Sequence, residues 1–454
     1  MVCRRLLIAI LFSAIAAASA AAAAAETTLE ALTATARRSG LRLLQGDHLV
    51  LVTDRPPRDG DGVEDLPAVF DAAWTEWCRH YGLDPAAHRE WRALGCLMVD
   101  PERFREAGLL PADLPDFANG FCAGRRIWLH DQSSAAYRRH LLLHEGVHAF
   151  TITLRDLDTP PWYTEGIAEY LATHRLADAA ADDTVRSIPE RFAPTPLPAR
   201  PEDVEQLGRI ERLRALRRAA ECPGLDTILG ADAADHRDLS AYAANWAAVT
   251  LLARHPAYAA AFRAAERGPL DRRFTARLAA SPGWDAAAAA RDFDAFTDEL
   301  DYGFDFVRSR LDWSPGQPLE ENRTVDVPAG SGWTNTGCRL RAGDRYTFSA
   351  SGRCLLEVLP ADAASGREEV RIETEPAGIS LAWYRGRPLG RLLVAQWVEK
   401  PTDGGRPRFV VIAAGQSGEL RAPVDGVAYC KLNEPPGELA DSEGRFTVAL
   451  RRIH

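Results

Sequence analysis

Residues 136–176 read AYRRHLLLHEGVHAFTITLRDLDTPPWYTEGIAEYLATHRL, and this stretch decides the fold of the first part of the chain. Apolar residues recur at helical spacing on both sides of the turn DLDTPPW, which predicts one helix over 136–154 and another over 163–176. The paired prolines of the turn cannot continue a helix. The sequence therefore predicts two consecutive helices, each of which carries histidine or glutamate residues.

The first of these helices contains the motif HEGVH. His144 and His148 share one helix face, where two neutral imidazoles can bind one cation at about 2.0 to 2.1 Å. Glu145 is placed to accept a proton from water as the water attacks a carbonyl group. A catalytic zinc ion needs a third protein ligand and an open position. Glu165 on the second helix, with sixteen residues between it and His148, supplies that ligand.

Other residues have predicted supporting roles. Glu169 follows Glu165 by one helical turn and is placed to accept the other ring N–H of His144, which fixes the orientation of that ligand. Gly166 permits close helix packing beside the metal.

A donor that stabilises the developing oxyanion is also needed. Tyr242, in AYAANWAAV, is the first candidate by position, although a buried aromatic helix residue is the more frequent explanation of such a tyrosine. His174 is the second candidate.

Two other interpretations of the motif stay open. In one, the two histidines share a solvated helix face by accident. In the other, the zinc site is structural or has lost its chemistry. Glu145 argues against the second interpretation, because a structural zinc site gains nothing from a free base beside it.

At this point the residues resemble the gluzincin metallopeptidases, the thermolysin-like group with H-E-x-x-H on one helix and E-x-x-x-[DE] on the next. The resemblance covers residues 120–171. The family also has an edge strand along its cleft, matched by GFCAGRRIWLHD, with which an extended peptide can pair. The family's two zinc-binding histidines correspond to His144 and His148, and its zinc-binding glutamate corresponds to Glu165. Its catalytic base corresponds to Glu145, and its last acid corresponds to Glu169.

The surrounding region, up to residue 312, is expected to be mainly helical with a small sheet at its front. Residues 41–54 and 120–131 predict strands, and 239–255 and 292–311 predict helices. The proline-rich stretch SIPERFAPTPLPARPED is expected to be a surface loop.

Composition changes after LDWSPGQPLEEN. From there on, short alternating runs separated by Gly, Pro and Asp predict a β-sandwich. The predicted fold class is therefore a multidomain α+β protein, divided into a signal peptide, a gluzincin-like domain, a linker and a lectin-like sandwich at residues 1–25, 26–312, 313–318 and 319–454.

The last region resembles the calcium-dependent galactose-binding lectin domains of bacteria, in WTNTGCRLRAGDRYTFSASG, GRPLGRLLVAQWV and VDGVAYCKLNEPPGELADSEGRFTVAL. The resemblance implies a calcium ion that binds sugar hydroxyls, held at Asn433, Glu434, Asp441 and Ser442. This sequence departs from the pattern, because Ser442 replaces an amide and Glu434 is longer than Asp. The alternative is a stabilising or surface-attaching sandwich with a simple hairpin turn there.

Three aromatic residues of the same region, Trp383, Tyr384 and Trp397, are candidates for stacking on sugars, although aromatic strand residues more often belong to the core.

The N-terminus predicts export. Residues 1–25 contain a short positive region, an apolar stretch and a small-residue end, typical of a secretory signal, with a transmembrane anchor as the alternative. A secreted or periplasmic location is therefore expected. The cysteines beyond this segment are interpreted as disulfides or buried apolar residues, and their odd number leaves at least one unpaired: Cys78, Cys96, Cys122, Cys222, Cys338, Cys354 and Cys430.

The 454 residues carry a net charge of −10 without a basic run, which argues against a nucleic-acid partner. The first functional hypothesis is a secreted zinc metallopeptidase acting on peptide or protein substrates, with a C-terminal targeting or carbohydrate-binding domain. The second is a carbohydrate-binding or adhesion protein with an inactive zincin scaffold. A third joins the two, as cleavage of glycoproteins selected by their sugars.

Overall fold

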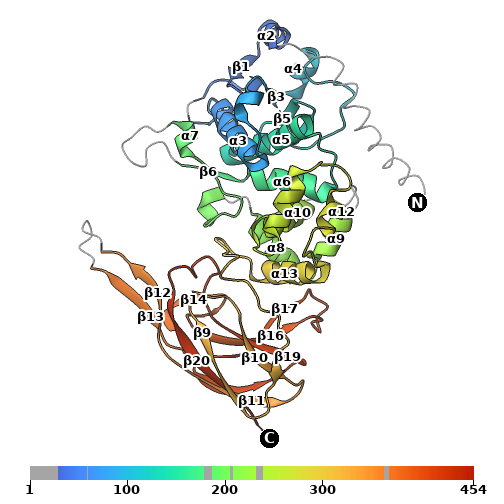
Figure 1. The fold of residues 1–454 in the computed structure, drawn as a ribbon. Helices are drawn as coiled ribbons and strands as arrows, with labels where there is room; N and C mark the ends of the chain where they lie inside the picture. Colours follow the sequence, from blue (N-terminus) through green and yellow to red (C-terminus); the bar gives the residue numbers. More distant parts are fainter. Residues whose placement is uncertain are drawn as a thin grey trace. The chain divides into compact units, whose positions relative to one another are not determined.

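The computed structural model describes residues 29–58, 60–177, 187–204, 208–231, 239–361 and 368–453 (Figure 1). The predicted signal peptide, residues 1–25, lies outside the described residues. The chain is a mixed α+β protein with several sheets and divides into two compact units. The first unit is made of Met1–Leu207, Ile228–Thr250 and Ala260–Trp284, and the second of Gly208–Thr227, Leu251–Ala259 and Asp285–His454.

A five-stranded sheet organises the first unit. Its strand order is β1-β2-β3-β5-β4, in which β2, β3 and β5 run parallel while β1 and β4 are antiparallel to their neighbours. The strands predicted over 41–54 and 120–131 are confirmed, and β3 is an additional strand. The bounds are β1 (Arg42–Gln45), β2 (Leu49–Thr53), β3 (Ala93–Met98), β4 (Gly120–Ala123) and β5 (Arg126–His130).

Helices cover this sheet. Residues of α2 and α4 join Val50, Val52 and Trp128 in one hydrophobic cluster, and α3 and α5 also contact the strands. The helices of this part of the chain are α2 (Leu29–Arg38), α3 (Leu66–Tyr81), α4 (Pro101–Glu106), α5 (Ala135–Arg155), α6 (Pro161–Ala172), α7 (Ile188–Arg191), α10 (Leu239–Arg254), α11 (Ala259–Arg267) and α12 (Phe274–Ala279).

Three details differ from the sequence prediction. The second predicted helix ends at Ala172, and the next residues form strand β6 (His174–Leu176). The proline-rich segment is not a plain loop, because it contains α7 and strand β7 (Phe192–Pro194), which pairs with β6. The last predicted helix ends at Glu299, since Leu300 is not helical and Gly303 has a positive φ of 70°.

Two sheets form most of the second unit. Their orders are β17-β16-β19-β10-β8 and β13-β12-β20-β11-β18, with β9 also paired to β20. The strands are β8 (Gln317–Pro318), β9 (Asn322–Pro328), β10 (Thr334–Leu340), β11 (Arg345–Ser351), β12 (Cys354–Leu359), β13 (Val370–Thr374), β14 (Ile379–Tyr384), β15 (Arg387–Leu389), β16 (Leu392–Val398), β17 (Arg408–Ala414), β18 (Ser417–Arg421), β19 (Gly426–Leu432) and β20 (Glu443–Arg452).

One hydrophobic core joins the two sheets. Alternating residues of β10, β16 and β19 from one sheet meet those of β11, β12 and β20 from the other in a single buried cluster. This alternation is what a two-layer β structure requires. The same unit contains α8 (Arg209–Arg218) and α13 (Ala286–Glu299), whereas α9 (Leu225–Gly230), α10 and α11 have residues in both units.

All seven described cysteines are free thiols, and six of them are buried, so burial rather than a disulfide explains them.

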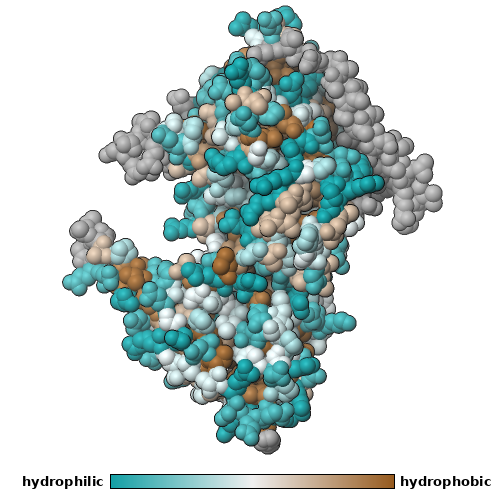
Figure 2. Space-filling model, in the orientation of Figure 1, coloured by the Kyte–Doolittle hydropathy of each residue, from teal (hydrophilic) through white to brown (hydrophobic). Residues whose placement is uncertain are grey.

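None of the described helices combines the length and apolar character that a bilayer crossing needs. On the face drawn in Figure 2, hydrophobic residues lie in small separate areas among hydrophilic ones.

Candidate metal centre

Helix α5 is fixed in place at its N-terminus. Ser134 caps it, because its side chain accepts a hydrogen bond from the backbone N–H of Tyr137 at 3.2 Å. Arg138, only 2% exposed, donates from Nε to Asp131 at 2.6 Å and from Nη1 to the carbonyl of Asp61 at 2.9 Å. A buried arginine with its donors satisfied holds the helix rigidly. The histidine motif therefore lies on a well-anchored element.

Glycines allow the helices around the motif to approach closely. A Cβ at Gly146 would lie 2.6 Å from a ring carbon of Phe70 on α3. A Cβ at Gly166 would lie 2.6 Å from the backbone oxygen of Asn245 on α10. Real Cβ atoms do not approach this closely, so both positions require glycine. The prediction that Gly166 permits close helix packing is confirmed.

The three predicted ligands come together. His144 Nε2 lies 3.2 Å from His148 Nε2, and Glu165 Oε2 lies 3.4 Å and 3.5 Å from these two nitrogens. A tetrahedral zinc ion with bonds of about 2.0 to 2.1 Å has ligand atoms about 3.3 to 3.4 Å apart. The three atoms thus form a triangle of the size of one face of a zinc tetrahedron.

The charge distribution also suits a cation. Burial by itself raises the pKa of Glu165, but the neighbouring His148 and His144 outweigh burial and hold the pKa well below its usual range. Glu165 is therefore ionised at neutral pH. The donor set of two imidazoles and one carboxylate could bind a metal ion, and it is the set found in catalytic zinc sites. The residues present fit a zinc ion.

Glu169 connects two histidines behind the site. His144 Nδ1 lies 3.0 Å from Glu169 Oε1, so the contact predicted for this pair is present. The other oxygen, Oε2, lies 3.4 Å from His140 Nε2. His140 was not identified from the sequence, although its position four residues before His144 places it on the same helix face. A carboxylate on the far ring nitrogen fixes the tautomer that leaves Nε2 free for a metal.

His140, His144 and Glu169 also form a group that could hold a metal ion. All three residues are buried, whereas His148 and Glu165 keep partial exposure at their side chains, 11% and 23%. A catalytic ion needs an open position for substrate. The set of His144, His148 and Glu165 meets that need better.

Glu145 lies beside the edge strand β4. A Cβ at Gly120, the first residue of β4, would lie 2.7 Å from Glu145 Oε1 and 2.9 Å from its Cγ. The β4 backbone therefore passes directly against this carboxylate. Burial raises the pKa of Glu145, and the nearby imidazoles of His144 and His148 oppose the shift.

The two candidates for the oxyanion donor lie in different surroundings. The ring of Tyr242 on α10 stands edge-on to the ring of His144, with 5.8 Å between centroids. Burial and the charges of Glu165 and Glu145 raise its pKa, so the hydroxyl stays protonated and can donate.

His174, by contrast, has both ring nitrogens engaged. Nδ1 lies 2.8 Å from the carbonyl oxygen of Ala172, and Nε2 accepts from Arg139 Nε at 3.4 Å. Burial lowers the pKa of His174 to about 3, so the ring is neutral. This arrangement favours Tyr242 over His174 as a free donor.

The residues predicted to bind calcium are partly assembled. Glu434 and Ser442 are in contact, since the Ser442 hydroxyl donates to both carboxylate oxygens at 2.9 Å and 3.0 Å. Asp441 is exposed, and its charge contributes to a raised Glu434 pKa. The Asn433 side-chain amide lies within 3.0 Å of the backbone oxygens of three other residues, Tyr384, Arg387 and Pro388.

The predicted sugar-stacking residues differ in exposure. Trp383 is 63% exposed. Trp397 packs against Trp313 and Phe409 with centroids 5.3 Å and 5.1 Å away, and the Tyr384 hydroxyl donates to Asp301 at 2.9 Å. Only Trp383 among the three has the exposure that a stacking platform requires.

Comparison with known proteins gives little further information. No family model matches the chain, and no curated protein matches it. Among solved structures, it is similar to the EclA N-terminal domain, a PllA-like lectin, at 21% identity and a TM-score of 0.20, covering 30% of this chain and 98% of that chain. A similarity at this level assigns neither a fold nor a ligand to this chain.

Proposed function

We propose that this chain is a zinc-dependent metallopeptidase that hydrolyses peptide bonds. The observation that carries the proposal is the triangle formed by His144 Nε2, His148 Nε2 and Glu165 Oε2, with edges of 3.2 Å, 3.4 Å and 3.5 Å. A zinc ion held there supplies Lewis acidity, which polarises a carbonyl group and makes water more acidic.

Glu145 is the proposed general base. It follows His144 directly on α5, is buried beside the proposed metal ligands, and has a pKa that burial raises above its ordinary value. In the proposed reaction, its carboxylate accepts the proton of the attacking water and passes it to the leaving amine. A site that only held a structural metal would not need this buried carboxylate.

Strand β4 is the proposed binding edge for the peptide. Among the described strands it pairs only with β5, so β4 is the edge of this sheet. The approach of Gly120 to Glu145 brings this edge next to the proposed base. An extended peptide that pairs with β4 through main-chain hydrogen bonds would therefore present its backbone carbonyl groups to the base.

Tyr242 is the proposed donor to the oxyanion. Its ring lies against His144, and its hydroxyl stays protonated at neutral pH. The alternative, an aromatic residue that only packs beside the metal ligands, predicts that Tyr242→Phe leaves turnover unchanged.

The decisive experiment measures zinc content and peptide cleavage on the purified chain. Wild type and Glu145→Gln should both contain one zinc ion per chain, because Glu145 is not a ligand, and only wild type should cleave a mixed peptide library. Chelation should abolish the cleavage and added zinc should restore it. Stoichiometric zinc without chelator-sensitive cleavage of any peptide would refute the peptidase proposal.

Carbohydrate binding by the C-terminal sheets is the second candidate function. The contact between Glu434 and Ser442, with Asp441 close enough to affect the pKa of Glu434, supports it because oxygen ligands of this kind suit calcium. Glycan-array binding that needs calcium but survives selective removal of zinc would support this function. The combined function predicts that deleting the residues after Asp312 weakens cleavage of glycoproteins more than cleavage of bare peptides, and equal effects on both would contradict it.

The proposed site of action is outside the cytoplasm, on the basis of the secretory signal in the sequence. Cleavage of the chain near residue 25 on export tests this, through N-terminal sequencing of the secreted protein. An intact N-terminus on cytoplasmic protein would contradict it.

A further inference from the structure

An arginine-lined cavity lies within the second unit, on residues that the proposed catalysis does not use. Its volume is about 820 Å³, in the range of small-molecule sites. Three aspartates, Asp298, Asp301 and Asp403, also line it. The arginines are Arg214, Arg217, Arg218, Arg385, Arg406 and Arg408.

Three separate segments supply these arginines. Arg214, Arg217 and Arg218 belong to α8. Arg385 belongs to the turn between β14 and β15. Arg406 lies in the segment before β17, and Arg408 is the first residue of β17. Residues of α13, among them Thr297 and Asp298, complete the wall. Segments far apart in the sequence therefore bring positive charges to one concave surface.

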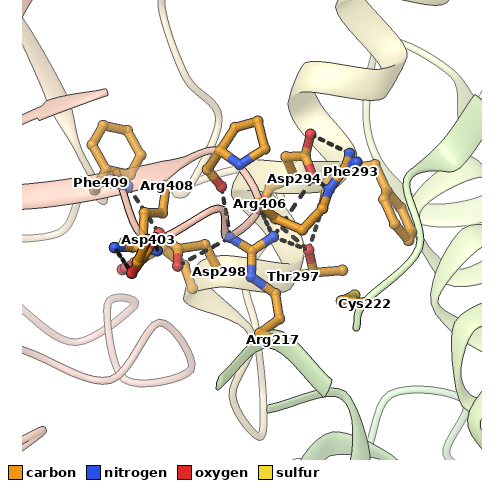
Figure 3. Close-up of polar contacts among 12 residues, drawn as sticks. Arg217, Cys222, Phe293, Asp294, Thr297, Asp298, Asp403, Arg406, Arg408 and Phe409 are labelled. Carbon is orange, nitrogen blue, oxygen red and sulfur yellow. Dashed lines mark hydrogen bonds and ion pairs between the residues drawn. The ribbon is translucent and has the colours of Figure 1, made fainter. Parts of the chain in front are cut away.

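Carboxylates hold several of these arginines in fixed orientations (Figure 3). Arg406 binds Asp294 through Nε and Nη2, at 2.9 Å and 2.8 Å. Arg408 binds Asp403 through Nη1 and Nη2, at 3.2 Å and 2.6 Å. Such two-point contacts fix the plane of a guanidinium group before any ligand arrives.

Arg217 is held even more completely. It donates to the backbone oxygens of Asp294 and Pro407 at 3.2 Å and 2.6 Å, and to Thr297 Oγ1 at 3.0 Å. Asp298 Oδ1 lies 3.3 Å from its Nη2. Arg217 thus connects α8, α13 and the segment before β17, and it lines the cavity.

Other guanidinium nitrogens keep unused donors. Arg406 Nη1 and Arg214 Nη1 make no hydrogen bond to any described residue, and both side chains are 29% exposed. Arg218 is exposed and makes no ion pair with the described part of the chain. These N–H groups are available to a ligand in the cavity.

The charges in the wall are not balanced. Five of the six arginines pair with carboxylates, whereas Arg218 pairs with none in the described part of the chain. The carboxylates are Asp294, Asp298, Glu299, Asp301 and Asp403, of which Glu299 also pairs with Lys431. A network that served only to join the helices to the sheets would not need the unpaired Arg218. Arg218 therefore leaves one positive charge of the lining without a partner among the described residues, on a chain whose net charge is −10.

We propose that this cavity binds a small organic anion through a tetrahedral oxyanion group, a phosphate or sulfate ester. The planar, fixed guanidinium groups match the oxygens of such a group. The volume accommodates more than one oxyanion, so a ligand with two such groups fits the site best.

Isothermal titration calorimetry on the full mature chain tests the proposal, with inorganic phosphate, inorganic pyrophosphate and a sulfated disaccharide as probes. Wild type should bind at least one probe saturably at one site. Arg218→Glu should weaken that binding about tenfold or more, since it removes a charged donor and adds a repulsive charge. Preference for pyrophosphate would identify a phosphate ester, and preference for the disaccharide a sulfate ester.

Arg341→Glu is the matched control, because it reverses an arginine that is 60% exposed and lies away from the cavity lining. Its affinity should equal that of wild type. Arg218→Gln is measured in parallel and should weaken binding even if the charge reversal unfolds the unit. Absence of saturable binding for all three probes, or equal affinities of Arg218→Gln and Arg341→Glu, would overturn the proposal.

Discussion

Gly120→Ala is expected to damage catalysis without removing the metal. The added Cβ would lie 2.7 Å from Glu145 Oε1 and 2.9 Å from its Cγ. An ordinary contact begins near 3.4 Å, so the carboxylate or the strand must move by roughly 0.7 Å. A misplacement of about 1 Å can cost about 100-fold in rate. We therefore expect kcat to fall by about 10-fold to 100-fold.

The zinc ligands are expected to stay in place in this variant. They lie on α5 and α6, and the three atoms nearest to the added methyl group all belong to Glu145. The free energy of unfolding should fall by about 1 to 3 kcal/mol, as for other overpacked interiors. Zinc content by elemental analysis, kcat on a cleaved peptide and urea unfolding measure the three quantities separately.

Gly230→Ala provides a matched control. A Cβ at Gly230 meets nothing within 4 Å, so this variant should keep wild-type kcat. If folded, zinc-loaded Gly120→Ala also kept wild-type kcat, the position assigned to Glu145 beside β4 would be wrong. Loss of zinc from Gly120→Ala would equally contradict the reasoning, because it would mean that the strain reaches the ligands.

Three further predictions concern single side chains. Glu169→Gln should lower zinc affinity by about 10-fold to 100-fold, measured by competition with a chelator, and an unchanged affinity would remove its role in orienting His144. Gly166→Ala should destabilise the first unit by about 1 to 3 kcal/mol in urea unfolding, because its Cβ would meet the α10 backbone, and unchanged stability would contradict that packing. Burial raises the pKa of Glu434 to about 8 from an ordinary value of about 4.5, so its contribution to stability is fully present below pH 4.5 and is lost as the pH rises to about 8. Glu434→Gln should abolish this part of the pH dependence in thermal unfolding, and identical pH profiles for variant and wild type would contradict it.

The sequence predicted the group of His144, His148 and Glu165, which could hold a metal ion, because the information is local. The spacing within HEGVH and the position of Glu165 after a proline turn specify two adjacent helices, and the structure brings these residues together. His140 was missed, although its four-residue spacing from His144 was readable. The role of His140 depends on the contacts of Glu169 with both imidazole rings, and these contacts join α6 to α5.

Contacts between distant segments were beyond sequence reasoning. The family resemblance placed this strand along the cleft, but the close approach of Gly120 to Glu145 depends on how β4 packs on α5 and was not predicted. The arginine-lined cavity likewise forms where α8, α13 and the end of the segment between β16 and β17 lie side by side, and their sequences do not predict this arrangement.

The predicted boundaries of two elements were wrong. The helix predicted to reach residue 311 ends at Glu299, because Leu300 leaves the helical conformation. The proline-rich segment forms a short strand through its pairing with His174–Leu176, which its composition does not reveal.

The central claim is that His144, His148 and Glu165 hold one zinc ion with an open position. X-ray absorption spectroscopy of the zinc-loaded protein tests it most directly. The account predicts four nitrogen or oxygen neighbours at about 2.0 to 2.1 Å, two of them imidazoles. Sulfur neighbours at about 2.3 Å, or a spectrum unchanged in Glu165→Gln, would contradict it.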